Sequence, residues 1–268
     1  MKKELFSFSK LTTFKTCPLS YYYTYVKKGP REDNIYSFLG KEIHSCLEDL
    51  QQGLISKENA IDRFEMAVAD ADMLGFEFPT ENSKNNFVEC MILYFKNYKA
   101  FTDITDFGIE EYFEIDVSGV TMRGYIDIYT IEDDKYIDVY DYKSSSKFSK
   151  KDLEEKKIQL ILYGIALKNK YPDKEVRSLN FDMCKYSKNK RGTLVERNKA
   201  DSQEVRGFVS IPFTEENIEL ATNFVKNIYD SINKNDTENI LDWEANKNPF
   251  FCKNLCSNFE ICRVNEVE

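Results

Sequence analysis

The chain of 268 residues has little histidine, glycine and proline, and it lacks any long apolar run. Its single histidine excludes zinc sites built on two histidines and metal clusters that need several. No stretch approaches the roughly 18 apolar residues of a membrane span, and the first residues lack the apolar core of a signal peptide. We therefore expect a cytoplasmic protein without a membrane segment. With 42% hydrophobic and 31% charged residues, the composition indicates a globular protein.

An excess of basic residues is also absent, since 46 acidic residues outnumber 37 basic ones and the formal net charge is −9. Proteins that bind phosphate groups usually carry a basic excess, so this balance at first sight argues against a nucleic-acid partner. The length predicts one large domain or two small ones and is enough to bury a substantial core.

The seven cysteines are an odd number in a chain without a secretion signal, which argues against a disulfide framework. Cys252, Cys256 and Cys262 fall within eleven residues, a density that favours metal binding over core packing. A closed site needs a fourth ligand, and Cys17, which is followed by a proline, is the best remaining candidate. We expect the others to be small core residues, because they lie in apolar helix or strand patterns: Cys46, Cys90 and Cys184.

Hydrophobic periodicity predicts a mainly helical first part, residues 1–105. We expect a helix pair broken at Cys17-Pro18 with Ser9 as N-cap, then amphipathic helices over residues 37–52, 57–71 and 80–101. A period of two then predicts an antiparallel meander over residues 110–117, 120–131 and 135–143. Further on, the pattern predicts helices over 151–169 and 214–234, strands over 176–186 and 207–211, and a cysteine-bearing tail over 243–268. The fold class expected is α/β (α+β).

The third predicted strand carries charges on a face that is otherwise apolar. Ile137, Val139, Asp141 and Lys143 alternate onto one side, so a carboxylate and an ammonium lie beside the core. Asp127, on the preceding strand, can lie beside Asp141 if the two strands form a hairpin. Two carboxylates at such a short distance repel each other, and a bound divalent cation relieves the repulsion. The alternative is a salt-bridged strand end that emerges into solvent.

Two further polar features have both a structural and a functional interpretation. The sole histidine, His44, lies within a regular predicted helix, where it is either a metal ligand or a surface or satisfied core residue. Gln159 and Tyr163 are four residues apart on the helix after the charged strand, so they share a face and can reach one ligand. Otherwise Tyr163 packs on the helix flank and Gln159 is exposed to solvent.

In their order along the chain, these features resemble the RecB-like, iron–sulfur branch of the PD-(D/E)XK nuclease superfamily, such as the CRISPR-adaptation exonucleases and the AddB nuclease domain. The matching segments are Ser7-Phe8-Ser9-Lys10-Leu11 with Cys17-Pro18, Gly40-x3-His44, Gly124-x-Ile126-Asp127, Asp141-Tyr142-Lys143, Gln159-x3-Tyr163 and the terminal cysteine trio. The resemblance implies a single nuclease domain over residues 1–268. Its restriction-endonuclease-like core, over 106–235, would be a central mixed sheet flanked by helices. The implied activity is that of a metal-dependent DNA exonuclease acting on single-stranded DNA or DNA ends.

The resemblance also implies a role for each matching residue. The ligands of Mg²⁺ or Mn²⁺ would be His44, Asp127, Asp141 and, through its backbone carbonyl, Tyr142. Lys143 would position or polarise the attacking water, and Gln159 and Tyr163 would contact the DNA and order the site. Oxygen ligands, one imidazole and waters suit these hard cations, which make a bound water more acidic and neutralise charge on the phosphate.

Four cysteines would hold a [4Fe–4S] cluster and join distant parts of the chain: Cys17, Cys252, Cys256 and Cys262. In this family the cluster is mainly a structural staple near the DNA path. The chain departs from the family in two places. Its spacing from Cys252 to Cys256 is C-x3-C where the family usually has C-x2-C, and Ile126 stands where the superfamily's nominal proline precedes the first aspartate. The alternative is a binding protein in which the same cysteines hold Zn²⁺.

Basic residues gather locally despite the acidic total, which makes the charge compatible with a DNA substrate. Those expected along the DNA path are Lys147, Lys185, Lys188, Lys190 and Arg191. The alternative for such a run is an ordinary solvated surface, and the alternative for the protein is a non-catalytic DNA-end-binding or recombination-partner module. The chain contains no helicase motif, so the expected partners are helicase, recombination or CRISPR-adaptation proteins.

Overall fold

The computed structural model describes residues 4–29, 33–101, 106–145, 148–184, 187–188, 194–195 and 208–262. By its contacts the chain divides into two compact units. The first unit combines Met1–Asn34, Glu114–Gly124 and Glu219–Glu268, and the second combines Ile35–Phe113 and Tyr125–Ile218. That the units together make up one domain over residues 1–268 stays a prediction.

Five strands form one mixed sheet in the order β1-β2-β3-β4-β7. The strands are β1 (Asp106–Val117), β2 (Val120–Glu132), β3 (Tyr136–Lys143), β4 (Glu175–Met183) and β7 (Phe208–Ile211). β3 runs antiparallel to β2 and parallel to β4, and β7 runs antiparallel to β4. The turn after β1 uses Ser118 and Gly119 at φ of 51° and 82°, the pair of positive angles that a type I′ hairpin turn requires. The mixed sheet with flanking helices confirms the predicted fold class.

The parallel pairing of β3 with β4 requires a crossover, which α6 (Lys150–Lys170) supplies. A capping box starts this helix, since Ser149 and Asp152 each accept a hydrogen bond from the other's backbone N–H. The helix packs on β3 and β4. At Gly164 the approach is close, because an added Cβ would lie 2.7 Å from Cε2 of Phe213. α6 is thereby fixed against the strands that carry the charged residues.

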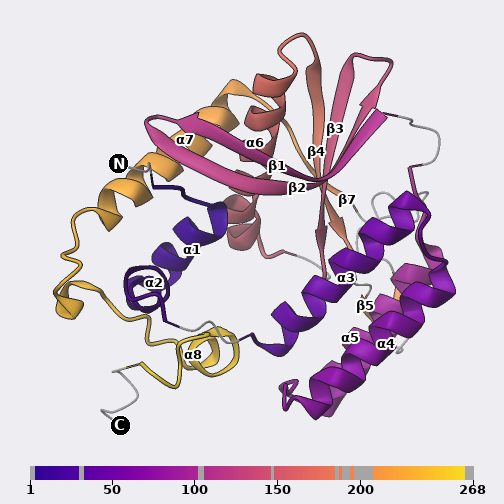
Figure 1. Ribbon diagram of the computed structural model, residues 1–268, viewed down its shortest axis with the longest axis horizontal. Coiled ribbons are helices and arrows are strands. Elements are labelled where there is room, and N and C mark those ends of the chain that lie inside the picture. The colour runs from indigo at the N-terminus through magenta and orange to yellow at the C-terminus, as the bar shows by residue number, and fades with distance from the viewer. Residues whose placement is uncertain are drawn as a thin grey trace. The chain divides into compact units, whose positions relative to one another are not determined.

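Three helices of the second unit, α3 (Ile35–Gln52), α4 (Lys57–Met73) and α5 (Glu81–Asn97), lie side by side (Figure 1). Their apolar faces form one core cluster with Ile128 and Tyr142 of the sheet. The three cysteines predicted to be core residues are all buried in this cluster: Cys46, Cys90 and Cys184. α5 ends at Asn97, earlier than predicted. The cluster holds α3 against the strands, which matters because α3 carries the sole histidine.

The first unit is built around a buried tryptophan. α1 (Phe8–Thr16), α2 (Pro18–Tyr21) and the π-helix η1 (Tyr22–Val26) contribute aromatic rings that contact Trp243. Further elements of the unit are the part of α7 (Glu215–Ile232) from residue 219 on, the short η3 (Ile240–Asp242), and α8 (Pro249–Leu255). The predicted break at Cys17-Pro18 is confirmed. The predicted N-cap is wrong, because the Ser7 hydroxyl, not that of Ser9, accepts the hydrogen bond from the N–H of Lys10.

Most of the proposed DNA-contacting residues lie outside the described residues, namely Lys147, Lys185, Lys190 and Arg191. Of Lys188 only the backbone is described, in β5 (Ser187–Lys188), which pairs with β6 (Leu194–Val195). Within the described ranges, no helix is both long and apolar enough to cross a membrane.

Candidate functional site

Two carboxylates from neighbouring strands form the centre of the candidate site. β2 and β3 pair with Ile128 opposite Tyr140, and the next step in this register places Asp127 opposite Asp141. Both aspartates are buried, with 8% and 1% of their surfaces exposed. The hairpin thus brings together the two residues that the sequence pattern singled out.

The protein compensates these buried charges only in part. Asp127 Oδ2 accepts a hydrogen bond of 2.8 Å from the backbone N–H of Tyr142. Burial, and then the charge of Asp141, nonetheless raise the pKa of Asp127 well above its ordinary value. Within the described residues, Asp141 Oδ1 has no hydrogen-bond partner although it is buried. A bound cation would stabilise buried carboxylate oxygens that lack a full set of hydrogen bonds.

Lys143 lies on the same face of β3 as Asp141 and forms an ion pair with it. Its Nζ donates a hydrogen bond of 3.1 Å to Gln159 Oε1, and Gln159 Nε2 donates one of 2.7 Å to the Tyr163 hydroxyl oxygen. Gln159 and Tyr163 share one face of α6, as their spacing predicts. Burial, followed by the charges of Asp141 and Asp127, raises the pKa of Tyr163, so its hydroxyl stays neutral. These hydrogen bonds fix the ammonium beside Asp141.

His44 reaches the same group from α3. Its Nδ1 lies 3.4 Å from Asp127 Oδ2, and the ring also hydrogen-bonds to the backbone of Tyr142. Burial lowers the pKa of His44, so the imidazole is uncharged at neutral pH, which is the form that binds metals. The Tyr142 hydroxyl lies 3.2 Å from that of Tyr98, the residue that follows α5, and this contact anchors the strand segment next to the histidine.

Glu110 on β1 joins the site, and the sequence analysis missed it. Atoms of His44, Asp127 and Glu110 lie within 4.8 Å of one another, and no other such group of metal-binding side chains occurs in the described ranges. The carboxyl group of Glu110 also hydrogen-bonds to that of Glu48 on α3. Burial, and then the charge of Glu48, raise the pKa of Glu110 to about 7. Asp141 is not in this group of three.

The signals for the two glutamates differ. Glu48 follows His44 by four residues on one helix, a spacing that points to the same face and could have identified it. Glu110 has a φ of 47°, a left-handed conformation that is uncommon outside glycine and that re-aims a side chain within a strand. No local sequence pattern predicts the left-handed conformation of Glu110.

The four cysteines predicted as cluster ligands gather in the first unit. The pKa of Cys252 is raised by burial and then by the nearby thiols of Cys256, Cys17 and Cys262. Cys17 Sγ accepts hydrogen bonds from the backbone N–H groups of Ser20 at 3.4 Å and Asn246 at 3.3 Å. All four are free thiols. Cys17 therefore lies near three cysteines that are more than 200 residues away in the sequence.

The fold and the site together define a mixed α/β protein whose sheet carries a buried acidic site of the kind that binds divalent cations. A sequence model of the PD-(D/E)XK nuclease superfamily matches residues 5–263. The chain therefore belongs to this superfamily, whose members are generally nucleases that use divalent metal ions. Membership implies DNA as the class of substrate, and the predicted superfamily is confirmed.

Two further comparisons add little to this assignment. Among solved structures, one titled "Crystal structure of SSO0001" is similar at 14% sequence identity and a TM-score of 0.37. That match covers 98% of this chain and 88% of the other. Among curated protein sequences, no match was found.

Proposed function

We propose that the protein is a metal-dependent DNA exonuclease of the RecB-like iron–sulfur branch, acting on single-stranded DNA or DNA ends. The observation that carries the proposal is the buried pair Asp127 and Asp141, with Lys143 held beside Asp141 and with no hydrogen-bond partner for Asp141 Oδ1 among the described residues. A structural salt bridge would account for Asp141 and Lys143 but not for a second buried carboxylate next to them. Membership of the superfamily supports the same class of reaction.

The donor atoms of the site fit Mg²⁺ or Mn²⁺. The residues that would hold the cation are His44, Asp127, Asp141, the backbone carbonyl of Tyr142 and, in addition, Glu110. When bound, such a cation makes a water more acidic and neutralises charge on the phosphate.

The remaining polar residues would orient the reacting groups. The Lys143 ammonium, held by Gln159, would donate a hydrogen bond to the attacking water and stabilise the negative charge that develops on the phosphate. The hydrogen bond from Gln159 to neutral Tyr163 keeps the amide oxygen of Gln159 directed at Lys143. Gln159 and Tyr163 would also contact the DNA.

Cys17, Cys252, Cys256 and Cys262 would hold a [4Fe–4S] cluster. Backbone N–H groups directed at Cys17 Sγ are the kind of donor that stabilises a cluster thiolate. Zn²⁺ bound by the same four thiols is the alternative. The cluster would link distant segments of the first unit.

The wider role extends the same proposal. DNA contacts are assigned to Lys147, Lys185, Lys188, Lys190 and Arg191, and the partner would be a helicase, recombination or CRISPR-adaptation protein that supplies DNA ends. Seven free cysteines support the reducing cytoplasm as the location.

A nuclease assay tests the proposed activity. Single- and double-stranded DNA, labelled at either end, is incubated with Mg²⁺, Mn²⁺ or EDTA. We expect metal-dependent release of short products from ends, and a loss of at least about 100-fold in Asp141→Asn and Lys143→Met. The matched control is Asp133→Asn, at the turn between β2 and β3, whose φ of 53° asparagine tolerates. Full activity of a folded Asp141→Asn variant, or cleavage of circular DNA at the same rate, would contradict the proposal.

The cluster has a separate test. Anaerobic purification should give a brown protein with broad visible absorption and about four iron atoms per chain. The Cys17→Ser variant should lose the colour, whereas Cys90→Ser, in the core of the second unit, should keep it. A colourless protein that contains zinc would reject the cluster while leaving the nuclease proposal intact.

A further inference from the structure

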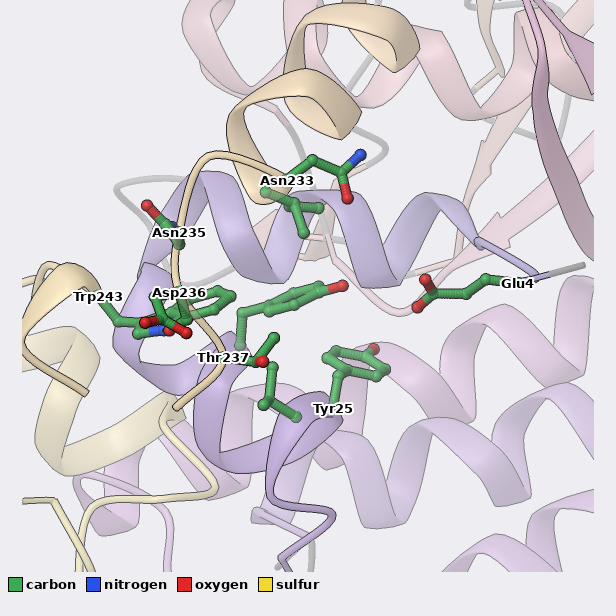
Figure 2. Close-up of a pocket in the computed structure, with 10 residues that line it drawn as sticks. Glu4, Tyr25, Asn233, Asn235, Asp236, Thr237 and Trp243 are labelled. Atoms are coloured by element: carbon green, nitrogen blue, oxygen red, sulfur yellow. The ribbon is translucent and has the colours of Figure 1, made fainter. Parts of the chain in front are cut away.

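A pocket of about 330 Å³ lies within the first unit, and the proposed nuclease activity makes no use of it. Its walls come from the N-terminal helices and from the segment after α7 (Figure 2). Three aromatic side chains line it, together with polar and apolar ones: Glu4, Tyr21, Tyr25, Val26, Ile232, Asn233, Asn235, Asp236, Thr237 and Trp243. This volume is at the lower end of the range for ligand pockets, enough for one side chain or a short amine.

The aromatic rings form a rigid wall. Trp243 stacks on Tyr21 with 5.7 Å between ring centroids and 8° between planes, and Tyr21 lies 4.9 Å from Tyr25. Trp243 is further fixed by a hydrogen bond of 2.9 Å from its indole N–H to the carbonyl of Asp236. Tyr25 belongs to η1, and π-helical turns are rare and are often found at functional sites. The wall therefore presents ordered π-faces rather than mobile side chains.

The charge of the lining has one sign. Glu4 and Asp236 contribute carboxylates, and none of the described residues that line the pocket is basic. Asp236 lies in an acidic turn, since its N–H donates to Asp242 Oδ2 and its Oδ1 accepts from the N–H of Glu238. Figure 2 shows Glu4 and Asp236 on different sides of the pocket. Phosphate and carboxylate ligands would be repelled here, whereas a cation would be attracted.

The chain itself shows that these groups accept an ammonium. Lys10 Nζ forms an ion pair of 2.5 Å with Glu4 Oε1. The same Nζ lies 4.1 Å from the ring centroid of Phe6, 5.4 Å from that of Tyr25 and 5.9 Å from that of Tyr21. Lys10 does not line the pocket. Because Glu4 is already paired with Lys10, Asp236 is the lining carboxylate that would receive a second cation.

We propose that this pocket binds an organic cation, the alkylammonium or guanidinium head of a basic side chain or of a polyamine. The head would lie against the ring of Tyr25, which attracts cations through its π-electrons, and would pair with Asp236. The amide and hydroxyl oxygens of Asn233, Asn235 and Thr237 supply hydrogen-bond acceptors for the remaining N–H groups. The two sources of this chemistry, a partner protein and a free polyamine, differ in what surrounds the head.

The protein of 268 residues is titrated with blocked single residues and with free amines. The probes are N-acetyl-lysine methylamide, N-acetyl-arginine methylamide, the neutral N-acetyl-citrulline methylamide, putrescine and spermidine. Binding is followed by calorimetry and by the fluorescence of Trp243, the sole tryptophan of the chain, which lines this pocket. We expect the cations to bind at least about fivefold more tightly than citrulline. Tighter binding of the blocked residues identifies a partner's side chain, and tighter binding of the amines identifies a polyamine; either result supports the pocket.

Variants separate the pocket from general surface charge. Tyr25→Leu and Asp236→Asn should each weaken binding by about three- to fivefold, and the double variant by about tenfold or more. The matched controls are Tyr23→Leu, which changes a tyrosine of the same π-helix outside the lining, and Asp230→Asn, which changes a half-exposed acid of α7 that pairs with Lys226. The inference is wrong if citrulline binds as well as arginine, or if no cation changes the heat or the fluorescence. It is equally wrong if the control variants weaken binding as much as the pocket variants.

Discussion

Replacement of Glu110 by glutamine should stabilise the metal-free protein at alkaline pH. Burial and the neighbouring carboxyl group of Glu48 raise the pKa of Glu110 from 4.5 to about 7. Such a difference corresponds to at most about 3 kcal/mol of free energy of unfolding. Because Glu110 is only half-buried, solvent screening reduces this to about 1–2 kcal/mol. Glutamine keeps the shape and the hydrogen bond while removing the charge.

The sign of this effect depends on pH in a defined way. Below about pH 4.5 Glu110 is protonated in both the folded and the unfolded chain, so the variant and the wild type should be equally stable. As the pH rises towards 7, only the unfolded chain releases its proton, and the wild type loses stability relative to the variant. Above about pH 7 the full difference should be reached. Urea unfolding in EDTA at pH 4.5, 6 and 8 measures it, with the exposed Glu65→Gln as control.

Addition of Mg²⁺ or Mn²⁺ should make the wild type more stable than the Glu110→Gln variant. A cation at about 100 times its dissociation constant stabilises the folded state by about 2.7 kcal/mol, and a variant that lacks one ligand gains less. The argument would be refuted by a stability difference between Glu110→Gln and the wild type that stays constant from pH 4.5 to 8. It would also be refuted if metal stabilised both proteins equally.

Three other substitutions give direct tests. Gln159→Leu removes both the hydrogen-bond acceptor for Lys143 and the donor to Tyr163. The rate of cleavage should fall by about tenfold or more, while the metal affinity measured by calorimetry is unchanged. A parallel loss of metal affinity would contradict the orienting role. Gly164→Ala should cost about 1–3 kcal/mol in urea unfolding, because the new Cβ would overlap Phe213. Gly40 lies in α3 with nothing within 4 Å of an added Cβ, so Gly40→Ala should instead stabilise the folded protein by about 0.5–1 kcal/mol. A Gly164→Ala variant more stable than Gly40→Ala would refute the packing argument.

Local patterns predicted the elements that carry the site. The register of a hairpin with a short turn is fixed by which face is buried, so Asp127 and Asp141 could be expected to meet from the alternation of β2 and β3 alone. The spacing of Gln159 and Tyr163 likewise follows from the helix period. In these cases the geometry is set by residues close in the chain.

The rest of the site depends on contacts between distant segments. Glu110 of β1 lies beside His44 and Asp127, with its backbone in a left-handed conformation and its carboxyl group hydrogen-bonded to that of Glu48 on α3. The cation pocket combines residues near positions 4, 25 and 236, and no single stretch of sequence contains its pattern. Hydrophobic periodicity describes one helix or strand at a time, so it does not predict which residues of distant segments lie together.

The division of the chain sets an order of assembly. The first unit is made from three separate stretches, and the second unit is encoded between them. The N–H of Leu19 bonds to the carbonyl of Glu244 at 2.8 Å, a contact that cannot form until the ribosome has released the later segment. The second unit, with the acidic residues of the candidate site, can therefore fold while synthesis continues. The first unit closes last, so a chain truncated before α8, which lacks Cys252, Cys256 and Cys262, should retain the acidic site of the second unit.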